Sequence, residues 1–102
     1  MTYETFRCEV KKMGFYFHIF NDVIKIENVI KGNNECLSSF GTTEFETVCN
    51  IYTKQRFSLY LTHEFDKLDE SVQEELFGLI VALNITPLNE RGSLYDYKIE
   101  LI

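Results

Sequence analysis

Apolar and polar positions along the chain follow two periods, one typical of strands and one typical of a helix. "FYFHIF" (15–20) and "VIKIENVI" (23–30) are rich in aromatic and β-branched residues and have the length of strands. Only Asn21 and Asp22 separate them, and both residue types tolerate positive φ, so a tight turn is expected between the runs. The pattern predicts an antiparallel hairpin. Alternation puts three isoleucines of the second run on one face: Ile24, Ile26 and Ile30.

Shorter runs after this hairpin indicate further strands. "KGNNE" (31–35) is a turn signal, and "CLSSF" (36–40) is a candidate third strand. Residues 44–55 fit a helical face as well as a strand, and their β-branched residues favour the strand. "FSLYLT" (57–62) alternates cleanly, and the tail "LYDYKIELI" (94–102) is a candidate final strand. The alternation in residues 57–62 places three apolar residues on one side: Phe57, Leu59 and Leu61.

The strongest predicted element is an amphipathic helix from about Glu70 to Leu83. Asp69 is a suitable N-cap, because a carboxylate there can accept a hydrogen bond from a first-turn amide. Thr86 and Pro87 end the pattern, since proline disfavours helical geometry in the residue before it. The apolar stripe consists of Val72, Leu76, Leu79, Ile80 and Leu83, with Phe77 expected to widen it.

The first residues of the chain favour a short helix that stops at Gly14, although Phe6, Cys8 and Val10 also alternate as in a strand. The predicted fold is therefore α+β. An antiparallel sheet of four to five strands is covered on one face by the helix at about 69–83, and a short helix precedes the sheet. The length of 102 residues fits one domain, residues 1–102.

Composition and charge narrow the function. The chain is 45% hydrophobic, which is typical of a folded globular protein. Its net charge is −6, and nonspecific binding to DNA or RNA is therefore not expected. No apolar run has the roughly 18 to 20 residues of a membrane span, and the N-terminus lacks a signal pattern. We therefore expect a cytoplasmic protein, in a bacterial or host cytosol, with no membrane partner.

A run of carboxylates stands out in "HEFDKLDESVQEEL" (63–76), where Lys67 is the one cation. Its six acids are Glu64, Asp66, Asp69, Glu70, Glu74 and Glu75. One interpretation is the solvated start of a helix, where anions are favoured by free amides and the helix dipole. The other is a surface for a basic protein. The sequence leaves both open, and we predict these six residues as the partner-binding site.

Residues with catalytic or metal-binding potential form no known motif. Cys8, Cys36 and Cys49 are odd in number and widely spaced, which predicts reduced and mostly buried thiols. His18 is expected beside aromatic residues on the face of the first strand away from the core, and His63 in an exposed loop. We expect no enzyme, no catalytic residue, no metal and no cofactor.

Aromatic and small residues have structural explanations as well as functional ones. Five tyrosines could stack on bases, but the acidic chain favours sheet packing or a protein interface: Tyr16, Tyr52, Tyr60, Tyr95 and Tyr97. Gly78 and Ala82 form a small-residue stripe on the predicted helix, which either is merely tolerated or permits the close approach of another helix or chain.

The segment "FDKLDESVQEELFGLIVALNITPLNER" (65–91) resembles a set of small proteins from phages and prophages of Gram-positive bacteria. They carry a segment similar to "LsEElQekLfeLivEya.TPieeR" followed by a tyrosine-rich end. The matching residues are Leu68, Gln73, Leu76, Phe77, Leu79, Ile80, Thr86, Pro87, Glu90 and Arg91. The chain departs with "ALN" in place of "EYA" and with uncharged residues after the arginine. The resemblance covers about a quarter of the chain, implies a phage context and transfers no catalytic residue.

The expected function combines this context with the charge. We expect a small acidic inhibitor, similar in role to anti-CRISPR proteins, that binds a basic surface on a host defence or nucleic-acid-handling protein. The alternative is a structural or assembly module that acts as a homodimer.

Overall fold

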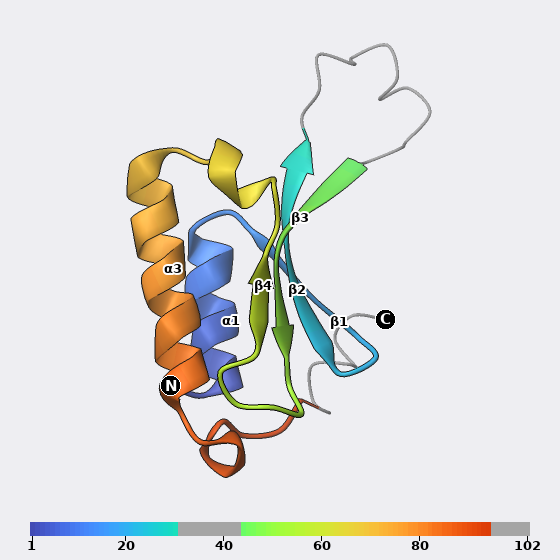
Figure 1. Cartoon of the computed structure of the whole chain (residues 1–102), viewed down its shortest axis with the longest axis vertical. Helices are drawn as coiled ribbons and strands as arrows, with labels where there is room; N and C mark the ends of the chain where they lie inside the picture. Colours follow the sequence, from blue (N-terminus) through green and yellow to red (C-terminus); the bar gives the residue numbers. More distant parts are fainter. Residues whose placement is uncertain (31–43, 95–102) are drawn as a thin grey trace.

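The computed structural model describes residues 1–30 and 44–94, and within these ranges the chain forms one antiparallel sheet with helices on one side of it (Figure 1). The strands pair in the order β1-β2-β3-β4, each antiparallel to the next. The α+β prediction is confirmed. The elements are α1 Tyr3–Lys12, β1 Tyr16–Phe20, β2 Val23–Ile30, β3 Glu44–Tyr52, β4 Leu59–Leu61, η1 Phe65–Lys67, α3 Glu70–Ile85 and η2 Leu88–Glu90.

The β1–β2 hairpin follows the predicted alternation. Asn21 and Asp22 have φ values of 49° and 63°, which is the left-handed geometry that a two-residue turn requires. The register pairs Phe20 with Val23, so Asn21 and Asp22 alone form the turn. Ile24 and Ile26 are fully buried, and the hairpin therefore presents its aliphatic face to the helices.

A bulge bends β3 in the middle of the sheet. Ile26 pairs with Cys49 whereas Glu27 pairs with Thr47, so Val48 is an additional residue on β3. Val48 and Cys49 are both buried, which explains why this strand showed no clean alternation. The strand interpretation of residues 44–55 is confirmed, with the strand ending at Tyr52.

Helix α1 packs its apolar side on the sheet. Thr2 is the N-cap, and its hydroxyl accepts a hydrogen bond from the backbone N–H of Thr5. Phe6 and Val10 are fully buried, and the Phe6 ring meets the Phe17 ring edge-on at 6.2 Å between centroids. The short N-terminal helix is thus confirmed.

Helix α3 runs two residues further than predicted, to Ile85, and it buries Leu76, Ile80 and Leu83 completely. The predicted cap is wrong in detail, because the Asp69 side chain makes no capping hydrogen bond. Asp69 is exposed, so water can solvate the first-turn amides instead. Phe77 is exposed as well and does not widen the buried stripe.

The end of α3 is built by residues of the segment 65–91. Arg91 is fully buried, and its Nε donates to the Thr86 carbonyl oxygen at 2.8 Å and its Nη2 to the Asn84 carbonyl oxygen at 3.3 Å. The Thr86 hydroxyl donates to the Ala82 carbonyl oxygen at 2.8 Å. These contacts satisfy carbonyl groups that a helix C-terminus leaves free. The threonine and arginine of the segment therefore terminate a helix.

Strand β4 is shorter than predicted. Phe57 has a φ of 63° and lies in the preceding loop, where its side chain is 63% exposed instead of facing the core. Leu59 and Leu61 do pack against the core. The predicted strand at 36–40 and the tail from residue 95 onward lie outside the described residues. No helix in the described part of the chain is long and apolar enough to cross a membrane.

Candidate protein-binding surfaces

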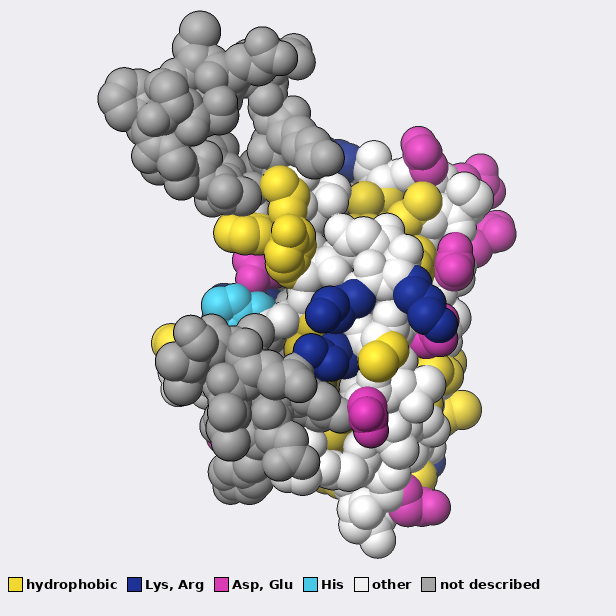
Figure 2. Space-filling view, turned by 180° about the vertical axis from the view of Figure 1, so that it is seen from behind, with side chains coloured by type: hydrophobic (Ala, Val, Ile, Leu, Met, Phe, Trp, Pro, Cys, Tyr) yellow, Lys and Arg dark blue, Asp and Glu magenta, His cyan; other side chains and the backbone are white. Residues whose placement is uncertain are grey.

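The predicted acidic residues lie where η1 and α3 begin. In Figure 2, Asp and Glu side chains gather along the upper right of the molecule, the edge that carries the start of α3 in Figure 1. Glu64 is half-buried, and the other five side chains are exposed: Asp66, Asp69, Glu70, Glu74 and Glu75. Helical spacing puts Glu70 and Glu74 one turn apart on the outer side of α3.

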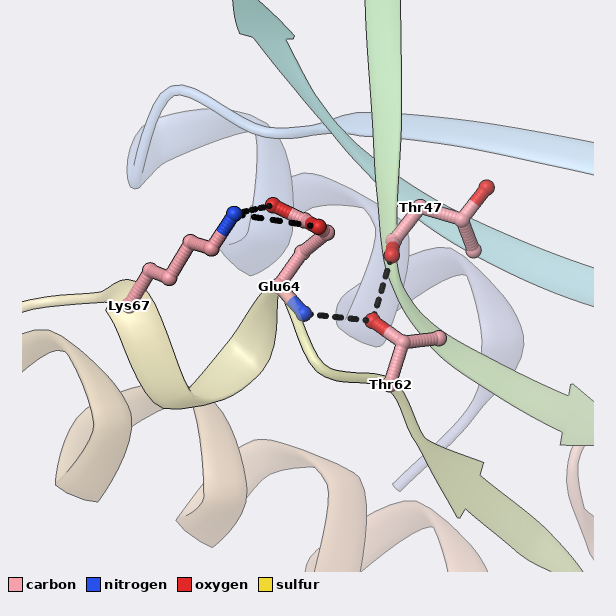
Figure 3. A network of polar contacts seen from close by, with 4 residues as sticks. All are labelled: Thr47, Thr62, Glu64 and Lys67. Carbon is pink, nitrogen blue, oxygen red and sulfur yellow. Dashed lines mark hydrogen bonds and ion pairs between the residues drawn. The ribbon is translucent and has the colours of Figure 1, made fainter.

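Glu64 differs from the other acids because it joins η1 to the sheet (Figure 3). Its carboxylate oxygens lie 3.4 and 3.2 Å from Lys67 Nζ. Its backbone N–H donates to Thr62 Oγ1 at 3.2 Å, and that hydroxyl donates to the Thr47 carbonyl oxygen at 2.5 Å. The hydrogen bond from Lys67 lowers the pKa of Glu64, and a second hydrogen bond with Glu46 lowers it further. Glu64 therefore has an internal role in addition to its predicted one.

The side of the sheet away from the helices carries a cluster of exposed aromatic residues. We call it the open sheet face, and its exposed aromatics are Tyr16, Phe20, Phe45, Tyr52 and Tyr60. The Tyr16 and Phe45 rings pack edge-on with centroids 5.2 Å apart. His18 lies on this face as predicted, exposed and with Nδ1 3.4 Å from a Glu27 carboxylate oxygen.

A second uncovered apolar surface runs along α3. Phe77, Val81 and Ile85 are 43%, 37% and 55% exposed, and their i, i+4, i+8 spacing places them on neighbouring turns. Gly78 lies among them, and the exposed acids occupy the first half of the same side of the helix. We call this side the outer face of α3, with an acidic first half and an apolar second half. The i+4 repeat is visible in the sequence, but it does not say whether these residues face the core or solvent.

The β3–β4 loop reaches the end of this outer face. Arg56 Nη2 donates to the carbonyl oxygen of Ile85, the last residue of α3. The Arg56 guanidinium carbon lies 4.5 Å from the centroid of the Phe57 ring. One cation and one exposed ring are thus held at the C-terminal end of α3, opposite to the end that carries the carboxylates.

The thiols and histidines do not assemble a reactive site within residues 1–30 and 44–94. Cys49 is buried, and burial raises its pKa from 9.0 to about 12, so the thiol stays protonated at neutral pH. Cys8 is exposed, contrary to the expectation of burial, and Cys36 lies outside the described residues. His63 is exposed as expected. The described residues contain no group of three or more His, Cys, Asp or Glu side chains that could hold a metal ion.

Two hollows beside the β1–β2 turn have volumes of about 350 and 410 Å³. Asp22 and Lys54 line both, and Tyr52 lines the second, which opens beside the open sheet face. Neither lining contains a histidine or cysteine among the described residues, so neither hollow holds a Cys–His pair.

No family model, curated protein or solved structure matches the chain. The similarity to phage and prophage proteins stays a prediction from the sequence.

Proposed function

We propose that this protein acts by binding another protein, as a small inhibitor encoded by a phage or prophage, and that it catalyses no reaction. The observation that carries the proposal is the open sheet face. Five exposed aromatic residues on one side of a sheet are typical of a recognition surface, because aromatic side chains contribute much of the energy of protein interfaces.

The acidic residues suggest the charge of the partner. Asp66, Asp69, Glu70, Glu74 and Glu75 are exposed at one edge, and the chain has a net charge of −6. Opposite charges accelerate association and favour a partner with a basic surface. Proteins that handle nucleic acids have such surfaces, so a host nuclease or another defence protein in the bacterial cytosol fits best.

The phage-like segment supports the context of this proposal but not its mechanism. Arg91 and Thr86, which belong to the matching residues, hold the end of α3 and lie away from the exposed acids. Their role is therefore structural. The proposed contact surface therefore rests on exposed residues elsewhere in the chain.

Capture of partners from a Gram-positive bacterial lysate tests the proposal with three proteins. These are the wild type, an aromatic variant with Tyr16→Ser, Phe20→Ser and Tyr60→Ser, and an acidic variant with Asp66→Asn, Asp69→Asn and Glu75→Gln. The wild type should retain a basic nucleic-acid-binding protein that added duplex DNA displaces. The aromatic variant should lose this protein, because the substitutions remove the apolar contact area.

The acidic variant separates steering from contact. It should capture the same protein with an association rate lower by about tenfold at low salt, and the difference should shrink as salt screens the charges. A Lys12→Ala variant, which changes an exposed charge on α1, is the matched control. Capture that none of the substitutions alters, or that DNA does not displace, would contradict the proposal.

A further inference from the structure

The outer face of α3 suggests a partner of its own. A helix at the surface of a globular protein has one apolar stripe, whereas a helix that is apolar all round is normally buried. The second half of α3 is apolar on both sides, because Leu76, Ile80 and Leu83 face the core while Phe77, Val81 and Ile85 face outward. In Figure 1, α3 lies at the outside of the molecule with no other described element beyond it.

Gly78 is a second, independent feature of this face. A glycine inside a helix costs about 1 kcal/mol relative to alanine. A Cβ atom built on Gly78 meets no atom within 4 Å, so nothing inside the described chain requires a glycine there. Gly78 also lacks the positive φ that Gly14 and Gly92 have. The missing side chain leaves open space at Gly78, beside the exposed Phe77 and Val81, in which another helix can pack closely.

The charges along α3 indicate how a second helix would be oriented. Glu70 and Glu74 lie in the first half of the outer face, and Arg56 is held at the other end by its bond to the Ile85 carbonyl oxygen. Gly78 lies near the middle of the 16-residue helix, seven residues from Ile85 and seven from Ser71. An antiparallel helix crossing at Gly78 would therefore place a Glu70 and Glu74 opposite each Arg56.

We propose that a second copy of this chain packs on the outer face of α3, antiparallel and related by a two-fold axis near Gly78. The acidic half of one copy then lies toward the end of the other copy that carries Arg56, and Phe77 and Gly78 of both copies lie near the axis. Two antiparallel helices also align their dipoles favourably. A single helix face is smaller than the roughly 800 Å² per partner of a standard interface, so we expect a weak dimer that forms at high micromolar concentrations.

This inference does not rest on the proposed function. The dimer forms from purified protein alone, whereas the inhibitor needs a host protein. Glu70 and Glu74 take part in the dimer, while Asp66 and the open sheet face stay outside the helix seam. The two ideas therefore fail in different experiments.

Sedimentation equilibrium of the purified full chain from low to high micromolar concentration is the test. The wild type should dimerise. Gly78→Gln should abolish the dimer, because a long side chain fills the crossing point, yet the monomer should become more resistant to urea since glutamine favours a helix more than glycine does. Arg56→Glu should raise the dissociation constant by about tenfold, because two symmetry-related attractions become repulsions.

A charge exchange and a matched control complete the test. Adding Glu70→Arg and Glu74→Arg to Arg56→Glu should restore the wild-type dissociation constant, with circular dichroism verifying the helix content. Tyr60→Ser, on the open sheet face, should leave the dimer unchanged. A wild type that is monomeric throughout, or a dimer lost with Tyr60→Ser and unaffected by Arg56→Glu and Gly78→Gln, would overturn the proposal.

Discussion

Helices α1 and α3 cover the same side of one sheet and contact each other, yet their outer sides differ. The outer side of α1 carries charged residues, among them Glu4, Lys11 and Lys12, and its buried residues Phe6 and Val10 form one stripe. In Figure 2, where α1 lies nearer to the viewer, Lys and Arg side chains gather near the middle of the visible surface. The outer face of α3 begins with acids and ends with Phe77, Val81 and Ile85.

This difference between the two helices separates residues that folding requires from residues that it does not require. Packing on the sheet requires only an apolar stripe, and α1 meets that requirement with a polar outer side that favours solubility. The apolar outer residues of α3 add nothing to the core of the described chain, and Gly78 weakens the helix. We infer that association, and not folding, accounts for the outer face of α3.

The largest expected effect is a loss of stability when a buried side chain is truncated, a feature that the two helices share. Phe6→Ala in α1 and Leu76→Ala in α3 should each reduce the free energy of unfolding by about 2 to 5 kcal/mol, because both side chains are fully buried and leave a cavity. Urea denaturation measures this loss. A loss below about 0.5 kcal/mol for either variant would show that its helix does not share the core.

The next effect concerns two thiols on opposite sides of the helix layer. Cys49 lies beneath the helices in the sheet, and its pKa is raised from 9.0 to about 12 by burial, while Cys8 is exposed on α1. Below pH 9 the Cys49 thiol is protonated in both the folded and the unfolded state, so its contribution to the free energy of unfolding is fully present. Between pH 9 and 12 only the unfolded chain releases the proton, so stability should fall by about 1.4 kcal/mol per pH unit.

Urea denaturation at pH 8 and pH 10 measures this fall, and Cys49→Ala is the control that removes it. Native protein at pH 8 should also react with iodoacetamide at Cys8 and not at Cys49. An equal pH dependence in wild type and Cys49→Ala would contradict the assignment.

The contrast between the helices also marks the limit of prediction from the sequence. Periodicity was sufficient for the β1–β2 hairpin and for the buried stripe of α3, because each has a local signal. For α1 the periodicity was ambiguous, and the helix stop at Gly14 favoured the helix. The loop position of Phe57 was not predictable from alternation, since a positive φ and the stacked Arg56 depend on contacts with the end of α3. The bulge at Val48 likewise depends on pairing across the sheet.

The candidate surfaces were predicted only in part for a related reason. Five of the six acids are exposed as a charge run implies, but the Glu64 contacts with Lys67 and Glu46 require the folded corner of η1 and β3. An apolar residue such as Phe77 gives no sign in the sequence of whether it faces the core or solvent. That distinction needs the position of the helix on the sheet.

A smaller gain in stability is expected from Gly78→Ala. The added methyl group meets no atom within 4 Å, and alanine lowers the cost of a helix interior by about 0.5 to 1 kcal/mol. Thermal unfolding at low micromolar concentration, where the monomer prevails, should show the increase. A loss of stability would mean that Gly78 has a structural role within the monomer.

Two substitutions that barely change stability should distinguish the outer side of α1 from the outer face of α3. Lys12→Ala removes an exposed ion pair with Glu9, whose atoms are 3.2 Å apart, and Phe77→Ser removes an exposed ring from α3. Each should change the free energy of unfolding of the monomer by less than about 0.5 kcal/mol, since neither side chain belongs to the core. Light scattering coupled to size-exclusion chromatography should nevertheless distinguish them.

Lys12→Ala should elute with the mass distribution of the wild type, whereas Phe77→Ser should shift it to the monomer. The reason is that Phe77 borders the gap at Gly78, where a second helix would bury it, while Lys12 lies on the other helix, outside that seam. Equal behaviour of the two variants in chromatography would remove the distinction between the helices, and the exposed apolar residues of α3 would then be ordinary surface residues.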